Sequence, residues 1–583
     1  MNSKHFHSDP THLITGALNS LSRLNPSVAV DEKYKIVFVK ETQHPQVSVI
    51  SGGGSGHEPA FASFVGHGML SGAIAGSIFA SPSTQQIQKC LLQCVDTTKG
   101  IMVIIMNYTG DVMHFGMAVE KARARGIKVD MLVVGDDVGV GRARAGKLGR
   151  RGIAGTVLVQ KITCAAAMLG SSLNEVSKVA SLVSDNLVSV GASLAHVHVP
   201  GRSLITDFNE SDSVEVGMGI HNEEGFKRIE TDLVGLVKEM LAQLLDLSDT
   251  DRGFVDIKSS DSVILLVNNL GGVSALEFGC IVEEVCSQLN SGYSLQLVRI
   301  LAGTYMSSLN GLGFSISILK IVETGLESGE SMVQLLDTST QATGWLNAFQ
   351  PGPMSTTVES RLASPAENIE ETLPPSRLSL DSNQAVKLLK SGLSRLISAE
   401  AEITKYDTMV GDGDCGLCLK NGAEAVLAEL EGKEWTDAVQ LVGRIAQVVE
   451  TNMDGTSGAI YAIFFNALAY GLSSQDTSSP TIVTAEMWAK ALEHALQSLS
   501  KYTPAKPGDR TLIDSLSPFV ATITETKDFS QATEAAKKGC ESTKGMEASF
   551  GRSVYIGGDD WKKCPDPGAY GMVEFLLGMS ASF

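Results

Sequence analysis

Short apolar runs alternate with amphipathic stretches over the first 350 residues of the chain. Four of these runs are rich in β-branched residues, as buried strands are: Val47–Ile50, Ile101–Ile105, Val129–Val134 and Val263–Val267. A polar or glycine-rich loop follows each of them. Strands that alternate with helices predict an α/β sheet that is mostly parallel. Ligands of such sheets bind beyond the carboxyl ends of the strands, so we expect the functional residues in these four loops.

The pattern changes near residue 351. The stretch PGPMSTTVESRLASPAENIEETLPPSRLSL contains five prolines and has no apolar period. This composition predicts an extended surface linker. We therefore expect an α/β domain at residues 1–350, a linker at 351–379 and a second domain at 380–583.

Helical periodicity dominates the second domain. Its first predicted helix has Ser382 as the expected N-cap and gathers its apolar residues on one face: Val386, Leu389, Leu393, Leu396 and Ile397. The stretches Ala438–Val449 and Trp488–Leu499 show the same amphipathic pattern. The second domain is therefore predicted to be all-α.

Composition narrows the classes of function. The chain has 583 residues and a net charge of −19, which argues against nucleic acid as a partner. Its nine cysteines are scattered, as in proteins of a reducing compartment. We find neither a signal peptide nor an apolar run of the roughly 20 residues that a spanning helix needs. We expect a soluble cytoplasmic protein with no membrane partner.

The densest group of acids in the helical domain is Asp407, Asp412 and Asp414, within KYDTMVGDGDCGLCL. Three carboxylates this close repel one another, and a hard cation such as Mg²⁺ relieves that repulsion. A solvated acidic turn is the alternative. The segment also matches G-x-G-x-x-G, but its acids and the lack of a preceding strand argue against dinucleotide binding. The pair Cys415 and Cys418 is a weak zinc signal without further ligands.

Three later stretches could complete a nucleotide pocket: Met453–Gly458, Pro507–Thr511 and Pro565–Gly568. They offer amides, hydroxyls and the cation of Arg510. Each alone is more often an ordinary turn or helix cap. Their significance comes from occurring together with the acid cluster.

The loops of the first domain supply histidines and a carboxylate. Ser51–Pro59 contains four glycines and His57, Asn107–Asp111 ends in an acid, and Val216–Gly225 contains His221. A single loop histidine is more often structural, and we interpret His196 and His198 in that way. The segment GRARAGKL at 141–148 matches the phosphate-loop pattern except at Leu148, so we reject it as an ATP site.

Together these motifs resemble the ATP-dependent dihydroxyacetone kinase family of the single-chain fungal and animal type. SGGGSGHEP, NYTGDVMHFG, GDDVGVGRARAGKLGRRGIAGTVLVQKI, VGMGIHNEEG and NNLGGVSALE resemble its substrate domain, and GDGDCG, DGTSGAIY, PGDRT and DPGA its nucleotide domain. The resemblance implies an α/β substrate domain of two subdomains, followed by a barrel of about eight antiparallel helices that binds Mg-ATP. It also implies a homodimer, with the nucleotide domain of one subunit serving the substrate domain of the other.

The resemblance assigns roles to individual residues. His221 would bond covalently to the substrate carbonyl as a hemiaminal, Gly54 and His57 would hold or activate the hydroxyls, and Asp111 would be the base. The whole implied substrate set is Gly54, Ser55, Gly56, His57, Met106, Asp111 and His221. Asp407, Asp412 and Asp414 would bind Mg²⁺. The implied nucleotide set is Cys415, Gly416, Leu417, Cys418, Thr456, Ser457, Thr503, Arg510, Thr511, Leu512, Asp566, Pro567 and Gly568.

Two positions depart from the family pattern. Met106 stands where the family usually has Lys, and Glu224 where it often has Pro. Met lacks the charge and the donors of Lys, which predicts that Met106→Lys raises kcat/KM for dihydroxyacetone. Two other functions stay open: cleavage of FAD to a cyclic flavin phosphate, and a non-catalytic triose-binding regulator. The sequence does not rank dihydroxyacetone against glyceraldehyde.

Overall fold

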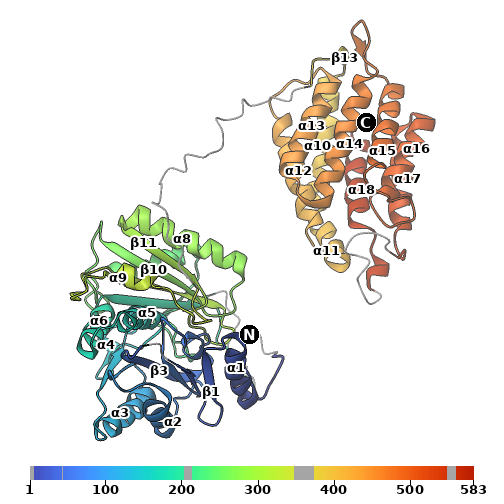
Figure 1. Cartoon of the computed structure of the whole chain (residues 1–583). Helices are drawn as coiled ribbons and strands as arrows, with labels where there is room; N and C mark the ends of the chain where they lie inside the picture. The colour runs from blue at the N-terminus through green and yellow to red at the C-terminus, as the bar shows by residue number, and fades with distance from the viewer. Residues whose placement is uncertain (1–4, 42–43, 203–212, 347–372, 412, 548–559) are drawn as a thin grey trace. The chain divides into compact units, whose positions relative to one another are not determined.

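The computed structural model describes residues 5–41, 44–202, 213–346, 373–411, 413–547 and 560–583. The chain divides into two compact units, Met1–Val358 and Glu359–Phe583. The first is an α/β unit and the second is helical, which confirms the predicted fold class (Figure 1). Most of the predicted linker lies outside the described residues.

The first sheet of the α/β unit has the strand order β1-β2-β4-β3-β5-β6. Strands β4, β3, β5 and β6 run parallel, and β1 and β2 add an antiparallel edge. Three of the four apolar runs form strands here, as predicted. The strands are β1 (Val28–Asp31), β2 (Ile36–Val39), β3 (Ser48–Ser55), β4 (Gly72–Ile78), β5 (Ile101–Met106) and β6 (Val129–Val134).

The second sheet has the order β11-β10-β12-β7-β8-β9 and corrects the expectation of mostly parallel strands. Only β10 and β11 pair in parallel, because helix α8 crosses over between them; every other pair is antiparallel. The predicted run Val263–Val267 lies in this sheet. The strands are β7 (Leu187–Ser193), β8 (Val214–Val216), β9 (Lys227–Ile229), β10 (Ser262–Asn269), β11 (Gln296–Gly303) and β12 (Gly313–Lys320).

Helices form layers around the two sheets (Figure 1). The apolar residues of β5 alternate between two cores: Val103 packs with α3, whereas Ile104 faces the core that α5 and α6 share with the second sheet. Helices α7 and α8 cover the far face of the second sheet. The helices are α1 (Pro10–Leu24), α2 (Thr84–Lys89), α3 (Thr109–Arg123), α4 (Arg142–Ala145), α5 (Thr156–Met168), α6 (Leu173–Asp185), α7 (Leu233–Leu245), α8 (Ala275–Tyr293) and α9 (Met332–Asp337).

The glycine-rich segment after Ile50 is strand rather than loop as far as Ser55. Neighbouring groups approach it too closely for side chains. A Cβ on Gly52 would overlap the carbonyl oxygen of Ile74 in β4, and one on Gly54 would lie 2.7 Å from the backbone nitrogen of Ala80. The glycines therefore allow close packing within the sheet, and the loop proper begins at Gly56.

The helical unit is a closed ring. Around the ring α10 contacts α12, each helix from α12 to α18 contacts the next, and α18 returns to α10; α11 packs on α12 and α18. This arrangement agrees with the expected barrel of about eight helices. The helices are α10 (Ser382–Ser398), α11 (Glu400–Val410), α12 (Cys415–Leu430), α13 (Ala438–Asn452), α14 (Gly455–Ser473), α15 (Ala485–Leu499), α16 (Ile513–Thr526), α17 (Phe529–Ser542) and α18 (Pro567–Ser580).

Two details of this unit differ from the expectation. The N-cap of α10 is Asp381, whose side chain accepts from the amide of Gln384, while Ser382 is the first helical residue. The short strands β13 (Leu378–Ser379) and β14 (Thr481–Ile482) pair in parallel. The predicted amphipathic stretches at 438–449 and 488–499 lie within α13 and α15, as expected.

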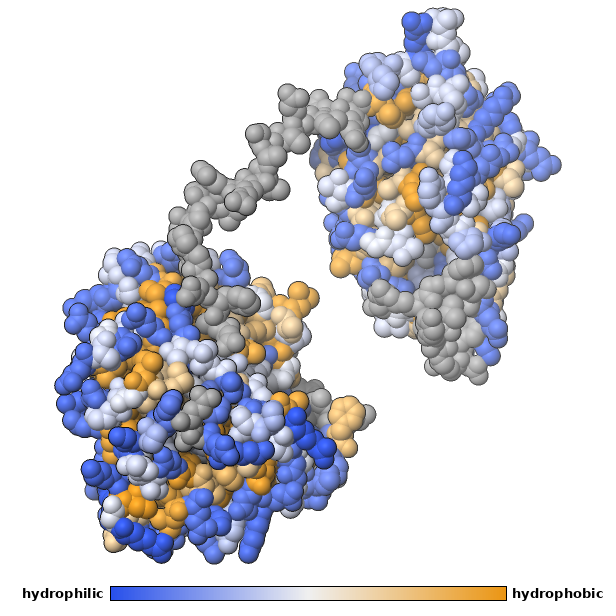
Figure 2. Space-filling model, viewed as in Figure 1, coloured by the Kyte–Doolittle hydropathy of each residue, from blue (hydrophilic) through white to orange (hydrophobic). Residues whose placement is uncertain are grey.

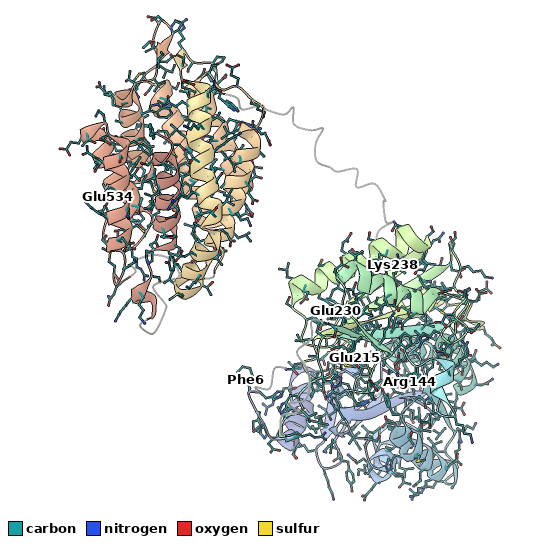
Figure 3. All side chains as sticks on the ribbon, turned by 180° about the vertical axis from the view of Figure 1, so that it is seen from behind. Phe6, Arg144, Glu215, Glu230, Lys238 and Glu534 are labelled. Carbon is teal, nitrogen blue, oxygen red and sulfur yellow. The ribbon has the colours of Figure 1, made fainter. Side chains whose placement is uncertain are left out.

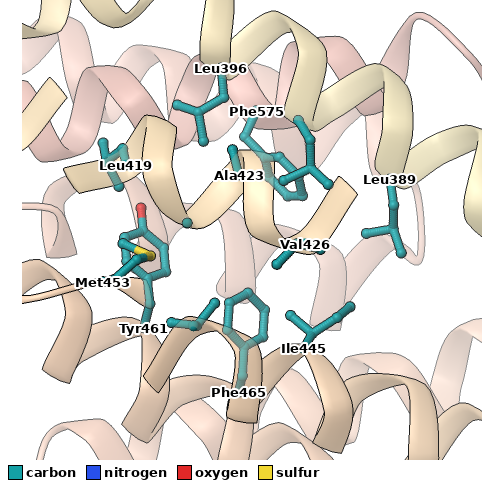
Figure 4. A pocket seen from close by; sticks show the side chains of 13 residues that line it. Leu389, Leu396, Leu419, Ala423, Val426, Ile445, Met453, Tyr461, Phe465 and Phe575 are labelled. Carbon is teal, nitrogen blue, oxygen red and sulfur yellow. The ribbon is translucent and has the colours of Figure 1, made fainter. Parts of the chain in front are cut away.

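An apolar pocket of about 80 Å³ lies between helices of the ring (Figure 4). It is lined mainly by aliphatic side chains of α10, α12 and α13, together with Tyr461, Phe465 and Phe575. On the outside of both units apolar areas are interspersed with polar ones (Figure 2). Within the described part of the chain, no helix has the length and apolar character needed to span a bilayer.

Candidate active site

Two histidines of the α/β unit meet at the junction of its two sheets. His57 follows β3 of the first sheet and His221 follows β8 of the second. Their Nε2 atoms lie 3.0 Å apart, and the rings meet edge to face. His57 is fully buried, with its Nδ1 2.9 Å from the carbonyl oxygen of Ser307. Burial and the neighbouring charge of His221 lower the pKa of His57 to about 3, so His57 is neutral at pH 7.

Glu223 contacts the edge of the His221 ring that faces away from His57. One carboxylate oxygen lies 3.0 Å from Nδ1 of His221, and the other accepts the backbone amide of His221 at 2.8 Å. Sequence reasoning did not single out Glu223. Its position two residues after His221 in the loop is the signal that could have identified it.

Two aromatic rings flank the histidine pair. The sequence analysis named neither as a site residue, although Tyr108 lies in the segment Asn107–Asp111. Phe79 stacks on His57 at 5.1 Å between centroids and meets His221 edge to face at 5.2 Å. Tyr108 meets His221 edge to face at 4.6 Å, and its hydroxyl is buried without a hydrogen-bond partner among the described residues. The rings cover the histidine pair only in part, because the His221 side chain remains 19% exposed.

Asp111 supplies a carboxylate to the same site. It lies in the first turn of α3 and is 4% exposed. Burial raises its pKa to about 6, against the opposing effects of a hydrogen bond from Ser81 and the charge of His221. Its Oδ1 atom is buried and has no hydrogen-bond partner within the described chain. A buried acceptor without a donor is suited to a substrate hydroxyl.

The glycine-rich residues before His57 shape the floor of this site. Gly56 has φ +103°, and a Cβ there would lie 2.8 Å from the Phe79 ring. Its amide donates to Glu58, and the hydroxyl of Ser55 donates to the carbonyl of Gly76. The structure thus places the continuous segment Gly54–His57 beside His221.

The acids of the helical unit lie beside the first turns of several helices. Asp407, near the end of α11, accepts the amide of Cys415 at the start of α12 at 3.0 Å. Cys418 donates to the carbonyl of Asp454, the residue before α14. Asp412 lies outside the described residues. No group of three or more metal-binding side chains gathers within the described ranges, which therefore leave the predicted acid triad untested.

The remaining predicted nucleotide residues belong to the same end of the ring. Thr456 and Ser457 lie in the first turn of α14, Leu512 precedes α16, and Asp566 caps α18. Burial raises the pKa of Asp566 to about 7, and the nearby Asp514 and Asp407 add to the rise while Arg510 opposes it. Exposed amides at helix N-termini bind phosphate, and clustered carboxylates bind a divalent cation, so these residues fit Mg-ATP chemically.

Comparisons with known proteins cover the whole chain. Residues 19–344 match the Dak1 domain and residues 409–581 match the DAK2 domain. The chain is 42% identical to a dihydroxyacetone kinase of Komagataella pastoris, over 100% of this chain and 99% of the relative. The chain belongs to the dihydroxyacetone kinase family.

Two further family relatives bear on function. The triokinase/FMN cyclase of Mus musculus is 35% identical, over 95% of this chain and 94% of the relative. The crystal structure of the dihydroxyacetone kinase from C. freundii in complex with AMP-PNP and Mg²⁺ matches with a TM-score of 0.60 and 28% identity, over 100% of both chains.

The positions that depart from the family pattern differ in their surroundings. Met106 ends β5, is 1% exposed and packs in the core between the sheets. Glu224 is largely exposed, with one carboxylate oxygen 3.8 Å from Arg144 (labelled in Figure 3). Glu224 thus adds a surface charge to the His221 loop. Met106 is a buried apolar side chain where the resemblance predicts Lys.

The residues that the motif analysis set aside have structural partners. His196 lies 3.2 Å from Glu215, and His198 lies 3.0 Å from His5. Arg142, in the rejected phosphate-loop segment, donates to the carbonyls of Thr250 and Gly253. These contacts agree with the structural interpretation of the two histidines.

Proposed function

We propose that this protein catalyses the ATP-dependent phosphorylation of dihydroxyacetone to dihydroxyacetone phosphate. Relatives named dihydroxyacetone kinase match the full length of the chain, which supports this activity. The observation that carries the proposal is the junction of the two sheets, where His57, His221 and Asp111 share one enclosed site. It combines a nucleophile, a proton carrier and a carboxylate with an unused acceptor atom.

His221 is the residue that we propose to capture the substrate. Its Nε2 atom adds to the C2 carbonyl of dihydroxyacetone to form a hemiaminal, and the carbonyl oxygen takes up a proton through His57. A three-carbon sugar offers little apolar surface for binding. A reversible covalent bond therefore provides affinity, and it selects ketones and aldehydes over glycerol, which has no carbonyl.

Asp111 is the base for the hydroxyl that receives the phosphoryl group. Its buried Oδ1 can accept the proton of that hydroxyl, and its pKa of about 6 leaves it mostly ionised at pH 7. A base needs this combination of a free lone pair and a pKa near the working pH. Gly54, Ser55 and Gly56 form the surface against which the captured sugar lies, and Met106 lies beneath that site.

Asp407, Asp412 and Asp414 would hold Mg²⁺, and the first turns of α12, α14, α16 and α18 would surround ATP. Bound magnesium neutralises phosphate charge and orients the phosphoryl group for in-line transfer. The implied contacts are Cys415, Gly416, Leu417, Cys418, Thr456, Ser457, Thr503, Arg510, Thr511, Leu512, Asp566, Pro567 and Gly568. We further propose a cytoplasmic homodimer that also accepts glyceraldehyde.

FAD cleavage to cyclic FMN is a second candidate, supported by the match to a protein named triokinase/FMN cyclase. Turnover of FAD with Mn²⁺ tests it directly. A third possibility is a triose-binding regulator without turnover. Tight binding of dihydroxyacetone together with zero ADP release would support the regulator.

A coupled assay of ADP release tests the proposed function. The full chain is supplied with Mg-ATP and a panel of dihydroxyacetone, glyceraldehyde and glycerol. We expect saturable ADP release with dihydroxyacetone and none with glycerol, since glycerol cannot form the hemiaminal. Equal turnover of glycerol, or no turnover of any triose, would contradict the proposal.

A further inference from the structure

Glu223 contacts His221 with both carboxylate oxygens. Oε1 lies 3.0 Å from Nδ1 of the ring, and Oε2 accepts the backbone amide of the same residue at 2.8 Å. Burial raises the pKa of Glu223, but the hydrogen bonds from His221 and the charge of its ring outweigh that effect and lower it to about 2. An ionised carboxylate can only accept hydrogen bonds. Nδ1 of His221 therefore carries a hydrogen.

The same argument applies to His57. Its Nδ1 faces the carbonyl oxygen of Ser307 at 2.9 Å, and a carbonyl only accepts, so this nitrogen also carries a hydrogen. If both rings were neutral, two Nε2 lone pairs would face each other at 3.0 Å. A proton between the two Nε2 atoms converts this repulsion into a hydrogen bond. The pair then holds three hydrogens on four nitrogens, and its single positive charge lies beside Glu223.

We propose that Glu223 is a positioning residue that fixes His221 with its hydrogen on Nδ1 and so dedicates Nε2 to carbonyl capture. The inference rests on the proposed function, because the ligand it concerns is a small ketone or aldehyde. It adds a role for Glu223 that the motif itself does not assign.

When His221 adds to the substrate carbonyl, every proton that moves comes from the histidine pair, and no other reactant is needed. The Nε2 proton passes from His221 to Nε2 of His57, and the freed lone pair of His221 forms the bond to the carbonyl carbon. The π electrons of the carbonyl move to its oxygen, which takes the proton from His57. His221 keeps its Nδ1 hydrogen and becomes an alkylated imidazolium. The positive charge thus remains beside Glu223 throughout, and no net proton enters or leaves.

The charge of Arg151 lies near enough to Glu223 for the two to interact. Arg151 is itself anchored by Asp137 at 2.8 Å and by the carbonyl of Gly217 at 2.7 Å. Gly219 leaves the space that the carboxylate occupies, because a Cβ there would overlap Oε2 of Glu223 and lie 2.6 Å from Nη1 of Arg151. With any larger residue at position 219, the Glu223 carboxylate would have to move from its present place.

The variant Glu223→Gln tests this role with almost no change in shape. The side chain of Gln has only one acceptor oxygen, so it can accept a hydrogen bond from Nδ1 of His221 or from the backbone N–H of His221, but not from both. Its NH₂ group then faces the remaining N–H donor. The matched control is Glu224→Gln, the exposed neighbour in the same loop. The other titratable groups that face His221 are His57, Tyr108 and Asp111, and both variants retain them.

Calorimetric titration of the full chain with dihydroxyacetone, without nucleotide, gives the readout. At pH 7.5 we expect the observed binding enthalpy of the wild type to be the same in HEPES and in Tris, whose ionisation enthalpies differ, because capture moves no net proton. We expect Glu223→Gln to weaken binding about tenfold to a hundredfold and to make the enthalpy depend on the buffer. Glu224→Gln should match the wild type in both respects.

The outcomes separate this inference from the proposed function. A wild-type protein that binds no dihydroxyacetone would overturn the function and the inference together. Capture by the wild type with uptake of about one proton would overturn the inference alone, whether or not the variants fold. A folded Glu223→Gln with unchanged affinity and buffer-independent enthalpy would also overturn it.

Discussion

His57 and His221 are separated by 164 positions in the sequence, yet their Nε2 atoms lie 3.0 Å apart. The contact arises because β3 of one sheet and β8 of the other both end at the junction between the sheets. Neither sheet alone contains the pair. The two-sheet architecture of the α/β unit is therefore what creates the site, and any change that separates the sheets should disable substrate capture before it unfolds either one.

Asp111→Asn should remove the base. We expect kcat to fall about 10²- to 10⁴-fold while dihydroxyacetone still binds, because the amide cannot accept the hydroxyl proton. Since the pKa of Asp111 is about 6, the wild-type rate should fall as pH drops through 6 and protonates the carboxylate. The variant should lack this acidic limb. Rate profiles between pH 5 and 8 test it, with Glu120→Gln on the same helix as the control.

Asp412→Asn tests the predicted magnesium site. Loss of one carboxylate should raise the Mg²⁺ concentration required for half-maximal activity and raise KM for ATP, while calorimetric binding of dihydroxyacetone persists. The exposed Glu493→Gln in the same unit changes net charge equally and should leave both values unchanged. If Asp412→Asn retains full activity at low magnesium, the assignment of this acid is wrong.

Met106→Lys introduces the residue that the sequence resemblance predicts at this position. A charge-assisted contact is worth on the order of 1.5–3 kcal/mol, which predicts that kcat/KM for dihydroxyacetone rises about tenfold to a hundredfold. The position is 1% exposed, so we also expect the added ammonium group to lower Tm by several degrees. Met106→Leu keeps the site apolar and should change neither quantity. An unchanged kcat/KM in a folded Met106→Lys would mean that this position does not limit catalysis.

Local patterns predicted the elements of the fold better than their arrangement. The run Ile101–Ile105 is strand β5 almost to the residue, because a strand buried on both faces needs apolar side chains throughout. The direction of a strand depends on its connections, so the antiparallel second sheet was not predicted. The segment Ser51–Ser55 looked like a loop because its glycines were attributed to turns, whereas neighbouring backbone excludes side chains there.

The residues of the candidate site were likewise predicted only in part. His57, Asp111 and His221 stand in motifs and were predicted as functional residues from the sequence, and the structure places them together. The same site also contains Phe79, Tyr108 and Glu223. These residues contact the histidine pair only once the chain has folded. Glu223 and Tyr108 had local signals, the first in its spacing from His221 and the second in its place within the segment Asn107–Asp111. The acid triad stays a prediction, because Asp412 lies outside the described residues.

The most direct test of the account is a crystal of the full chain soaked with dihydroxyacetone. We predict continuous electron density between the C2 atom of the sugar and Nε2 of His221, with tetrahedral geometry at C2. The same soak of His221→Ala should show no bonded sugar. A sugar bonded to another residue, or one lying unbonded beside His221 in the wild type, would contradict covalent capture by His221.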